Sequence, residues 1–154
     1  MISYRKATIG DASELARIRS IFVAEIADIH CEQERQKLEA GNKTYFDATL
    51  SDDSFVAWLA LDGDKIVSTS GLSFYVVPPN HECHDGRVAY IMNIYTIPEY
   101  RKQGLGTVLF KKIVDEAKQR GYKKITLNAT DIGKPLYEKY GFVDVIGDMV
   151  FYVE

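Results

Sequence analysis

Residues able to bind an anion lie near the middle of the chain, where a strand-like run leads through a proline into a glycine-rich turn. The segment from Asn93 to Leu109 reads NIYTIPEYRKQGLGTVL, and its Arg101, Gly104 and Gly106 precede an amphipathic helical pattern. Backbone N–H groups at a helix start, the helix dipole and nearby cations together bind phosphate groups. Glycine permits positive φ angles and lets a ligand approach the backbone. The segment therefore predicts a phosphate or pyrophosphate site.

Two common phosphate-binding loops do not fit this segment. A dinucleotide fold requires G-x-G-x-x-G, but Leu109 stands where the third glycine would be. A nucleoside-triphosphate loop requires G-x-x-x-x-G-K-[S/T], and the chain contains no such run. What remains is Arg-x-x-Gly-x-Gly after a hydrophobic strand and a proline.

The downstream elements add a second pattern. Residues 106–120 place apolar side chains at helical spacing, Lys124 to Ala129 read as a strand, and a helix over Lys134 to Tyr140 lies within LYEKYGF. The RKQGLG loop, followed by helix, strand, tyrosine-bearing helix and Gly-Phe, resembles the core of the GNAT family, the GCN5-related N-acetyltransferases. The resemblance covers roughly residues 90–142 and is to small, single-domain, bacterial-type members.

The resemblance implies an α/β fold with a mixed, largely antiparallel central sheet of six to seven strands flanked by about four helices. We expect residues 1–154 to form one domain. The remaining pattern predicts a first strand over residues 2–7, a helix over 11–29, and a second helix over 30–40 that ends at Gly41-Asn42. It also predicts a hairpin over 55–77, a strand over 88–97 before the loop, and two short strands from Phe142 on, around Gly147-Asp148.

Composition narrows the classes of function. The chain is 46% hydrophobic and 27% charged with a net charge of −3, so no basic field attracts nucleic acid or an anionic membrane. No apolar run approaches membrane-spanning length, and the first residues read as a strand rather than a signal peptide. Two cysteines do not form a disulfide framework. We expect a cytoplasmic protein without nucleic-acid or membrane partners, either a monomer or a homodimer.

The family resemblance assigns chemistry to particular residues. It implies acetyl-CoA as co-substrate, a primary amine of a small molecule as acceptor, and Tyr137 as the general acid that protonates the departing sulfur. Backbone donors near the end of the strand would polarise the thioester carbonyl. Asn93, with Tyr90, would hold a water that relays the proton of the amine. The predicted cofactor-binding residues are Ile94, Tyr95, Thr96, Arg101, Lys102, Gln103, Gly104, Leu105, Gly106, Thr107, Asn128, Thr130 and Gly133.

The sequence departs from the family pattern at three places. Thr130 and Gly133 stand where an asparagine and an alanine are common, and the strand over 88–97 lacks the glutamate that often serves as general base. A base acting through water would then come from a carboxylate elsewhere, and the candidates are Glu25, Asp28, Glu82 and Asp85.

Three alternatives stay open. The acid-rich region between Glu25 and Glu39 suits a cationic acceptor, or it is a solvated helix face. The run from His81 to Asp85 consists of side chains that can bind metals, but their spacing favours a polar loop, and we expect no metal. The alternatives to a small-molecule acetyltransferase are a CoA or acyl-CoA sensor without turnover, a protein or peptide N-acetyltransferase, and an enzyme for a longer acyl chain.

Overall fold

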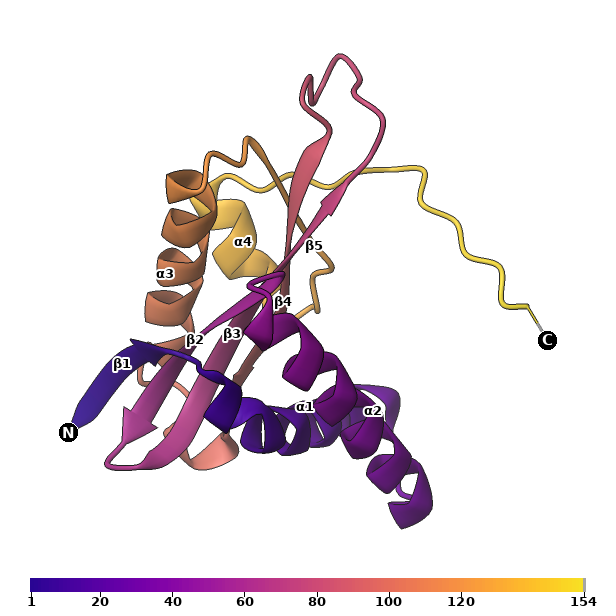
Figure 1. Ribbon diagram of the computed structural model, residues 1–154. Helices are drawn as coiled ribbons and strands as arrows, with labels where there is room; N and C mark the ends of the chain where they lie inside the picture. The colour runs from indigo at the N-terminus through magenta and orange to yellow at the C-terminus, as the bar shows by residue number, and fades with distance from the viewer. Residues whose placement is uncertain (154) are drawn as a thin grey trace.

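The computed structural model describes residues 1–153, which form one five-stranded sheet with helices on both faces (Figure 1). The strands follow one another across the sheet in chain order, and every neighbouring pair is antiparallel except the last, β4 and β5, which is parallel. The strands are β1 (Ile2–Lys6), β2 (Phe55–Asp62), β3 (Lys65–Val76), β4 (Arg87–Thr96) and β5 (Lys124–Leu127). The helices are α1 (Ala12–Ala27), α2 (Glu32–Ser51), α3 (Leu105–Gln119) and α4 (Lys134–Tyr140), with short 3-10 turns at Ile9–Asp11 and Pro98–Tyr100.

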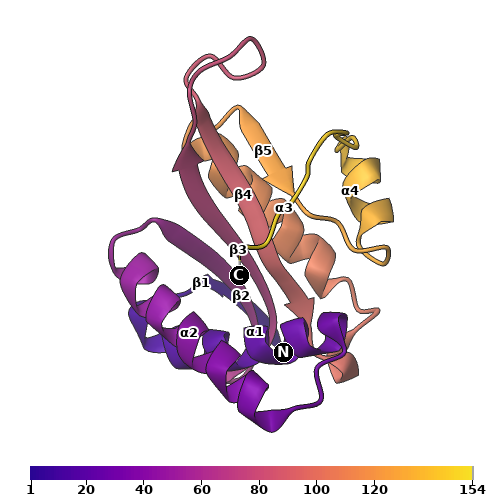
Figure 2. The ribbon, with the colours of Figure 1, turned by 90° about the vertical axis from the view of Figure 1, so that its right-hand side faces the viewer.

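Strand β2 shows why both faces of the sheet are covered. Successive side chains in a strand point to opposite faces. Phe55, Ala57 and Leu59 pack into a cluster with α1 and α2, whereas Ala60 packs with Leu105 and Leu109 of α3 on the other side. The near-continuous burial of β2 follows from this sandwich. Figure 2 shows α1 and α2 in front of the sheet, with α3 behind it and α4 beside β5.

Strands β4 and β5 separate halfway along β4, which leaves the rest of that edge of β4 without a neighbouring strand. They pair only from Val88 to Ile91 on β4, because β5 ends at Leu127. On its other side β4 carries a bulge: Thr69 faces Tyr95 and Gly71 faces Met92, so β4 gains one residue around Asn93. Asn93 has a φ of 58°, which is unusual for a residue other than glycine. A β-bulge that re-aims side chains here could not be read from the periodicity.

The helix predicted to end at Gly41-Asn42 continues to Ser51, so that prediction is wrong. Glycine inside a helix costs about 1 kcal/mol relative to alanine. The continuation places Phe46, 1% exposed, and Leu50 in the core, and that packing outweighs the local cost. Among residues 1–153 no helix is both long and apolar enough to cross a membrane.

The two short strands expected after Phe142 are also absent from the described residues, and the sheet has five strands rather than six or seven. Residues 142–153 have no regular structure, and the last part of this segment runs away from the body (Figure 1). A strand requires a neighbour to complete its hydrogen bonds, and this segment pairs with none. Phe142 is partly buried, but the large apolar side chains after it are all at least 72% exposed: Val143, Val145, Ile146, Met149, Val150, Phe151, Tyr152 and Val153.

Candidate active site

The glycine-rich turn lies between β4 and α3 and has the geometry of an anion-binding loop. Lys102 and Gly104 have positive φ angles, 62° and 80°, and Gly104 is the residue before the first turn of α3. Alternating left-handed residues turn successive N–H groups toward one side. Within residues 1–153 the N–H groups of Lys102, Gln103 and Gly104 donate to no acceptor. A Cβ at Gly104 would project into open space, so room for an anionic group remains beside these donors.

Arg101 does not point its charge at this loop. Its Nε donates to the Thr96 carbonyl (2.9 Å), and its Nη2 pairs with Glu25 Oε2 of α1 (3.1 Å). The Tyr95 hydroxyl donates to the other oxygen of Glu25 at 2.5 Å, and burial together with that bond raises the pKa of Tyr95 to about 12. In this arrangement Arg101 and Tyr95 fix the end of β4 to α1, and the backbone supplies the loop's donors.

A cleft of about 310 Å³ occupies the place where β4 and β5 separate. Asn93 lies on its β4 side and is 3% exposed as a residue, and neither atom of its buried side-chain amide has a hydrogen-bond partner within the described residues. Burying an unpaired amide costs about 1–3 kcal/mol. A buried amide that lacks partners and lines a cleft is a group that a ligand or water can satisfy. The lining comes from α1, β4, β5, the loop after β5, and α4: Arg19, Phe22, Val23, Ile26, Tyr90, Ile91, Met92, Asn93, Ile94, Leu127, Asn128, Ala129, Thr130 and Tyr137.

Tyr137 of α4 forms part of the cleft wall. Its ring packs against Phe110 and Phe142, and its hydroxyl makes no hydrogen bond within residues 1–153. Burial raises the pKa of Tyr137, so the phenol keeps its proton at neutral pH. A Cβ on Gly133 would lie 2.9 Å from the Tyr137 hydroxyl oxygen. Glycine in place of the more usual alanine therefore makes room for the tyrosine hydroxyl.

The remaining predicted residues of this wall bond to one another. Asn128 Nδ2 donates to the Tyr90 hydroxyl (2.9 Å), and Tyr90 lines the cleft together with Asn93. The Thr130 hydroxyl accepts from the Gly133 N–H (3.2 Å) and so supports the start of α4. The structure thus brings Asn93, Asn128, Thr130 and Tyr137 to one cleft.

Sequence reasoning missed Arg19, a residue of α1 that lines the same cleft. Burial lowers the pKa of Arg19, while the nearby Tyr90 and Tyr45 oppose that effect. Arginine stays charged at neutral pH even with such a shift. No acidic side chain among residues 1–153 forms an ion pair with Arg19, and the cleft lining includes no carboxylate. On the sequence Arg19 is one more cation on an amphipathic helix, so no motif marks it.

The carboxylates considered as the general base lie elsewhere. Glu25 is held by Tyr95 and Arg101, and Glu25 and Asp28 line a separate hollow beside His30. Glu82 and Asp85 lie in the loop after β3, where Glu82 pairs with Lys124 and Asp85 accepts the Arg87 N–H. None of the four lines the cleft.

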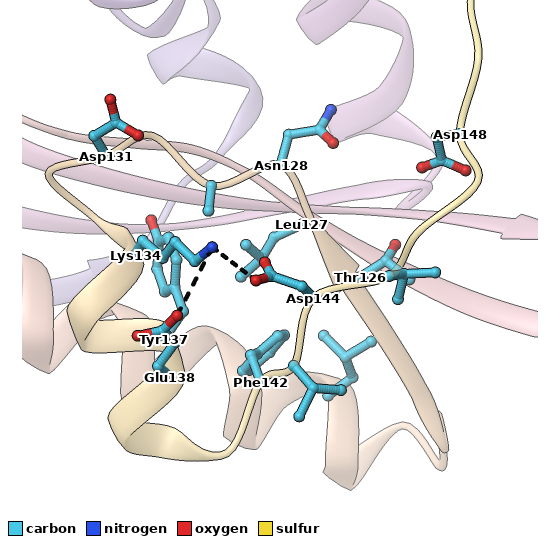
Figure 3. Close-up of a pocket in the computed structure, with 14 residues that line it drawn as sticks. Thr126, Leu127, Asn128, Asp131, Lys134, Tyr137, Glu138, Phe142, Asp144 and Asp148 are labelled. Carbon is cyan, nitrogen blue, oxygen red and sulfur yellow. Dashed lines mark hydrogen bonds and ion pairs between the residues drawn. The ribbon is translucent and has the colours of Figure 1, made fainter.

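A second cavity, of about 360 Å³, adjoins the cleft and shares Asn128 and Tyr137 with it (Figure 3). It lies between β5, α4 and the chain that follows α4. Lys134 of α4 pairs with Asp144 at 2.7 Å and with Glu138 at 3.8 Å, and these contacts hold one wall (Figure 3).

Comparison with known protein families shows that the segment containing this site matches one family. Residues 23–142 match the model of the Acetyltransferase (GNAT) family, and this range includes α2, the sheet from β2 onward, the loop, α3 and α4.

Solved structures give the same fold. A crystal structure of a predicted acetyltransferase with acetyl-CoA from Clostridium acetobutylicum is 32% identical, with a TM-score of 0.89 over 99% of this chain and 96% of that one. A GCN5-related N-acetyltransferase from Ralstonia eutropha JMP134 shares the fold at 23% identity, with a TM-score of 0.89 over 99% of both chains.

Among curated proteins, thialysine N-epsilon-acetyltransferase of Mus musculus is 30% identical over 79 residues, 51% of this chain and 44% of that protein. The chain spans about half or less of the length of the curated relatives that it matches.

Proposed function

The chain belongs to the GNAT family of acetyltransferases, and from this we propose that it transfers the acetyl group of acetyl-CoA to a primary amine of a small molecule. One observation carries the proposal. The same strand, β4, opens the cleft at its bulge and leads at its end into the anion-binding loop. A phosphate-bearing carrier bound at the loop can therefore extend along β4 to the Asn93 amide and Tyr137.

The backbone of residues 102–107 would hold the pyrophosphate of CoA, since its N–H groups are free at 102–104 and begin a helix at 105. The edge of β4 from Ile94 to Thr96, which lies beyond the last β5 pair, would bind the pantetheine arm as an added strand, with Asn128, Thr130 and Gly133 opposite. Acetyl-CoA supplies an acyl group on a thiol leaving group. Arg101 contributes by holding the loop to α1.

We assign Tyr137 as the general acid. Its hydroxyl proton passes to the sulfur as the carbon–sulfur bond breaks, while the acceptor nitrogen bonds to the carbonyl carbon. The raised pKa of Tyr137 keeps this proton available at neutral pH. Asn93 and Tyr90 would orient a water that takes the proton from the amine, because the cleft lining offers no carboxylate. That water passes its proton to solvent, and Tyr137 regains one in the same way.

We further propose that the acceptor carries an anionic group, as an amino acid does. Arg19 is a charged residue of the cleft wall without an acidic partner among the described residues, and a carboxylate would satisfy it. The acids that suggested a cationic acceptor lie outside the cleft: Glu32 and Glu34 are exposed, and Glu32 pairs with Arg35. The name of the mouse relative points the same way, since thialysine is an amino acid.

The test is a CoA-release assay with paired acceptors, beside calorimetry of acetyl-CoA binding. Lysine and cadaverine, or ornithine and putrescine, differ by one carboxylate. We expect wild type to favour the amino acid of each pair. Arg19→Gln should raise the KM for the amino acid about 10- to 100-fold, which corresponds to the free energy of one hydrogen bond to a charged group. Arg17→Gln is the matched control, because Arg17 lies on the same helix and pairs with Glu14.

The outcomes separate the proposals. Preference for the diamines, or an Arg19→Gln variant with the same KM as Arg17→Gln, contradicts an acceptor with an anionic group. Either result leaves the proposal of acetyl transfer to an amine intact. Tight acetyl-CoA binding without release for any amine or peptide contradicts turnover and supports a sensor. Release only with a peptide in the panel supports a protein N-acetyltransferase.

A further inference from the structure

Strand β3 carries three consecutive hydroxyl side chains in its buried part. Ser68, Thr69 and Ser70 are each at most 1% exposed. Burying a hydroxyl costs free energy unless the group forms a hydrogen bond. Each of the three donates to a backbone carbonyl of a neighbouring strand: Ser68 to Tyr95 (3.0 Å), Thr69 to Asn93 (2.9 Å) and Ser70 to Trp58 (3.3 Å). The hydroxyl groups of this run therefore serve the backbone of β2 and β4.

The Thr69 hydrogen bond is the one that reaches the bulge of β4. Opposite the single residue Ser70, β4 has two residues, Asn93 and Ile94. Such an extra residue disrupts the ladder of backbone hydrogen bonds locally. The Thr69 hydroxyl supplies a donor to the carbonyl of Asn93, the residue with a φ of 58°. Thr69 is 0% exposed and is not part of the cleft lining, so it acts on the backbone and not on a ligand.

The direction of the Asn93 carbonyl fixes the direction of the next N–H group. In a planar trans peptide unit the C=O and the N–H point in opposite directions, and the bond between Asn93 and Ile94 is trans. With the Asn93 carbonyl held by Thr69 of β3, the Ile94 N–H points away from β3. On that side β5 has already ended, since its last pair with β4 is at Ile91, and Ile94 lines the cleft.

We propose that Thr69 is a positioning residue, whose hydroxyl holds the Asn93–Ile94 peptide so that the Ile94 N–H faces the thioester carbonyl of acetyl-CoA. This role rests on the proposed function, because acetyl-CoA supplies the thioester. When the acceptor nitrogen bonds to the carbonyl carbon, negative charge develops on the carbonyl oxygen, and a donor fixed in advance stabilises that charge. The charge is lost again when the carbon–sulfur bond breaks and the carbonyl re-forms.

Two substitutions at Thr69 test the role by steady-state kinetics and by calorimetry of acetyl-CoA binding. Thr69→Val keeps the shape of the side chain and removes the hydroxyl, whereas Thr69→Ser keeps the hydroxyl. We expect Thr69→Val to lower kcat about 10²-fold, the effect of losing one donor to the developing charge, without changing the Kd of acetyl-CoA. Thr69→Ser should keep the wild-type kcat.

Ser70→Ala is the matched control. Ser70 is as buried as Thr69, but its hydroxyl donates to β2 instead of the bulge, so kcat should stay at the wild-type value. Thr69→Val and Ser70→Ala each lose one buried hydrogen bond, and both should unfold at a lower urea concentration than wild type. An equal fall of kcat in these two variants, or a Thr69→Ser variant as slow as Thr69→Val, overturns the proposal.

A measurement without turnover separates this inference from the proposed function. NMR of the full chain without substrate reports on the peptide through the carbonyl carbon resonance of Asn93 and the amide resonance of Ile94. We expect both resonances to shift in Thr69→Val and to keep their wild-type positions in Thr69→Ser and Ser70→Ala. If wild type releases CoA with no amine, the proposed function is contradicted. Resonances that stay in place in Thr69→Val overturn the role of Thr69 in either case.

Discussion

At the scale of single residues, Tyr137 offers the sharpest test of the proposed chemistry. Tyr137→Phe keeps the ring that packs on Phe110 and removes only the hydroxyl, which has no partner within residues 1–153. We therefore expect acetyl-CoA affinity to be unchanged and kcat to fall about 10²-fold, the size of a lost general acid. Steady-state kinetics and calorimetry measure both. Tyr140→Phe, on the same helix and bonded to Lys118, is the control, and an equal loss in both variants would contradict the assignment.

The residues of the site differ in how far the sequence predicts them. The loop glycines and Tyr137 belong to contiguous motifs, so their place in the fold follows from local order. Arg19 belongs to no motif, because its role depends on how α1 crosses β4. Arg101 illustrates the reverse: a cation beside a phosphate loop suggests phosphate contact, but Glu25, far away in sequence, pairs with it. Local pattern does not reveal a partner supplied by tertiary packing.

At the scale of elements, the turn into α3 combines a backbone requirement with a binding role. A side chain at Gly104 requires a left-handed conformation, which costs about 1–2 kcal/mol, and it projects into the open space beside the free N–H groups. We expect Gly104→Glu to abolish CoA binding. Gly63→Glu is the matched control, because Gly63 also has a positive φ, 60°, and open space, but lies in the β2–β3 turn. Calorimetry with CoA on both variants decides: similar losses would mean that the effect is general destabilisation.

Glu116 connects three elements through one carboxylate. It accepts from Lys6 of β1 (2.9 Å), Trp58 of β2 (3.3 Å) and Arg120 after α3 (3.0 Å). Burial raises the pKa of Glu116, but these three donors together lower it more, so the folded value lies below the unfolded 4.5. A lowered folded pKa stabilises the fold above pH 4.5, and that stabilisation disappears as the pH falls through the folded value.

We therefore expect Glu116→Gln to lose about 1–3 kcal/mol of unfolding free energy at pH 7. The difference from wild type should shrink as the pH falls below 4.5, because the wild-type carboxyl becomes protonated as the pH passes through its folded pKa. Urea unfolding at pH 7 and at an acidic pH below 4.5 measures this. Asp115→Asn, the neighbour on α3 without an ion pair among the described residues, should change little. A deficit of the same size at both pH values would show that the carboxylate charge is not responsible.

Helices and strands were predictable where the spacing of apolar residues or a turn signal is sufficient by itself to specify them. The five strands of the sheet, α3 and α4 lie within a residue or two of the expected bounds, because apolar spacing and terminal glycines specify them. The bulge at Asn93, the passage of α2 through Gly41 and the unpaired tail were not predicted. Each depends on a neighbour: β3 for the bulge, the core around Phe46 for α2, and a missing strand for the tail.

At the scale of the whole molecule, the exposed apolar side chains after Gly147 bear on whether the chain is a monomer or a homodimer. If residues 149–153 complete the sheet of a second copy, folding includes association, and mass action makes the thermal midpoint depend on protein concentration. In that case we expect the Tm of wild type to rise as the protein concentration increases from about 1 to about 100 μM, and the Tm of a chain ended after Ile146 to be lower and independent of concentration. A tail that folds onto its own β5 would also lower the Tm when removed. It would give no concentration dependence in wild type, however, because its burial is intramolecular. Scanning calorimetry across that range therefore separates a strand shared between two molecules from a strand within one.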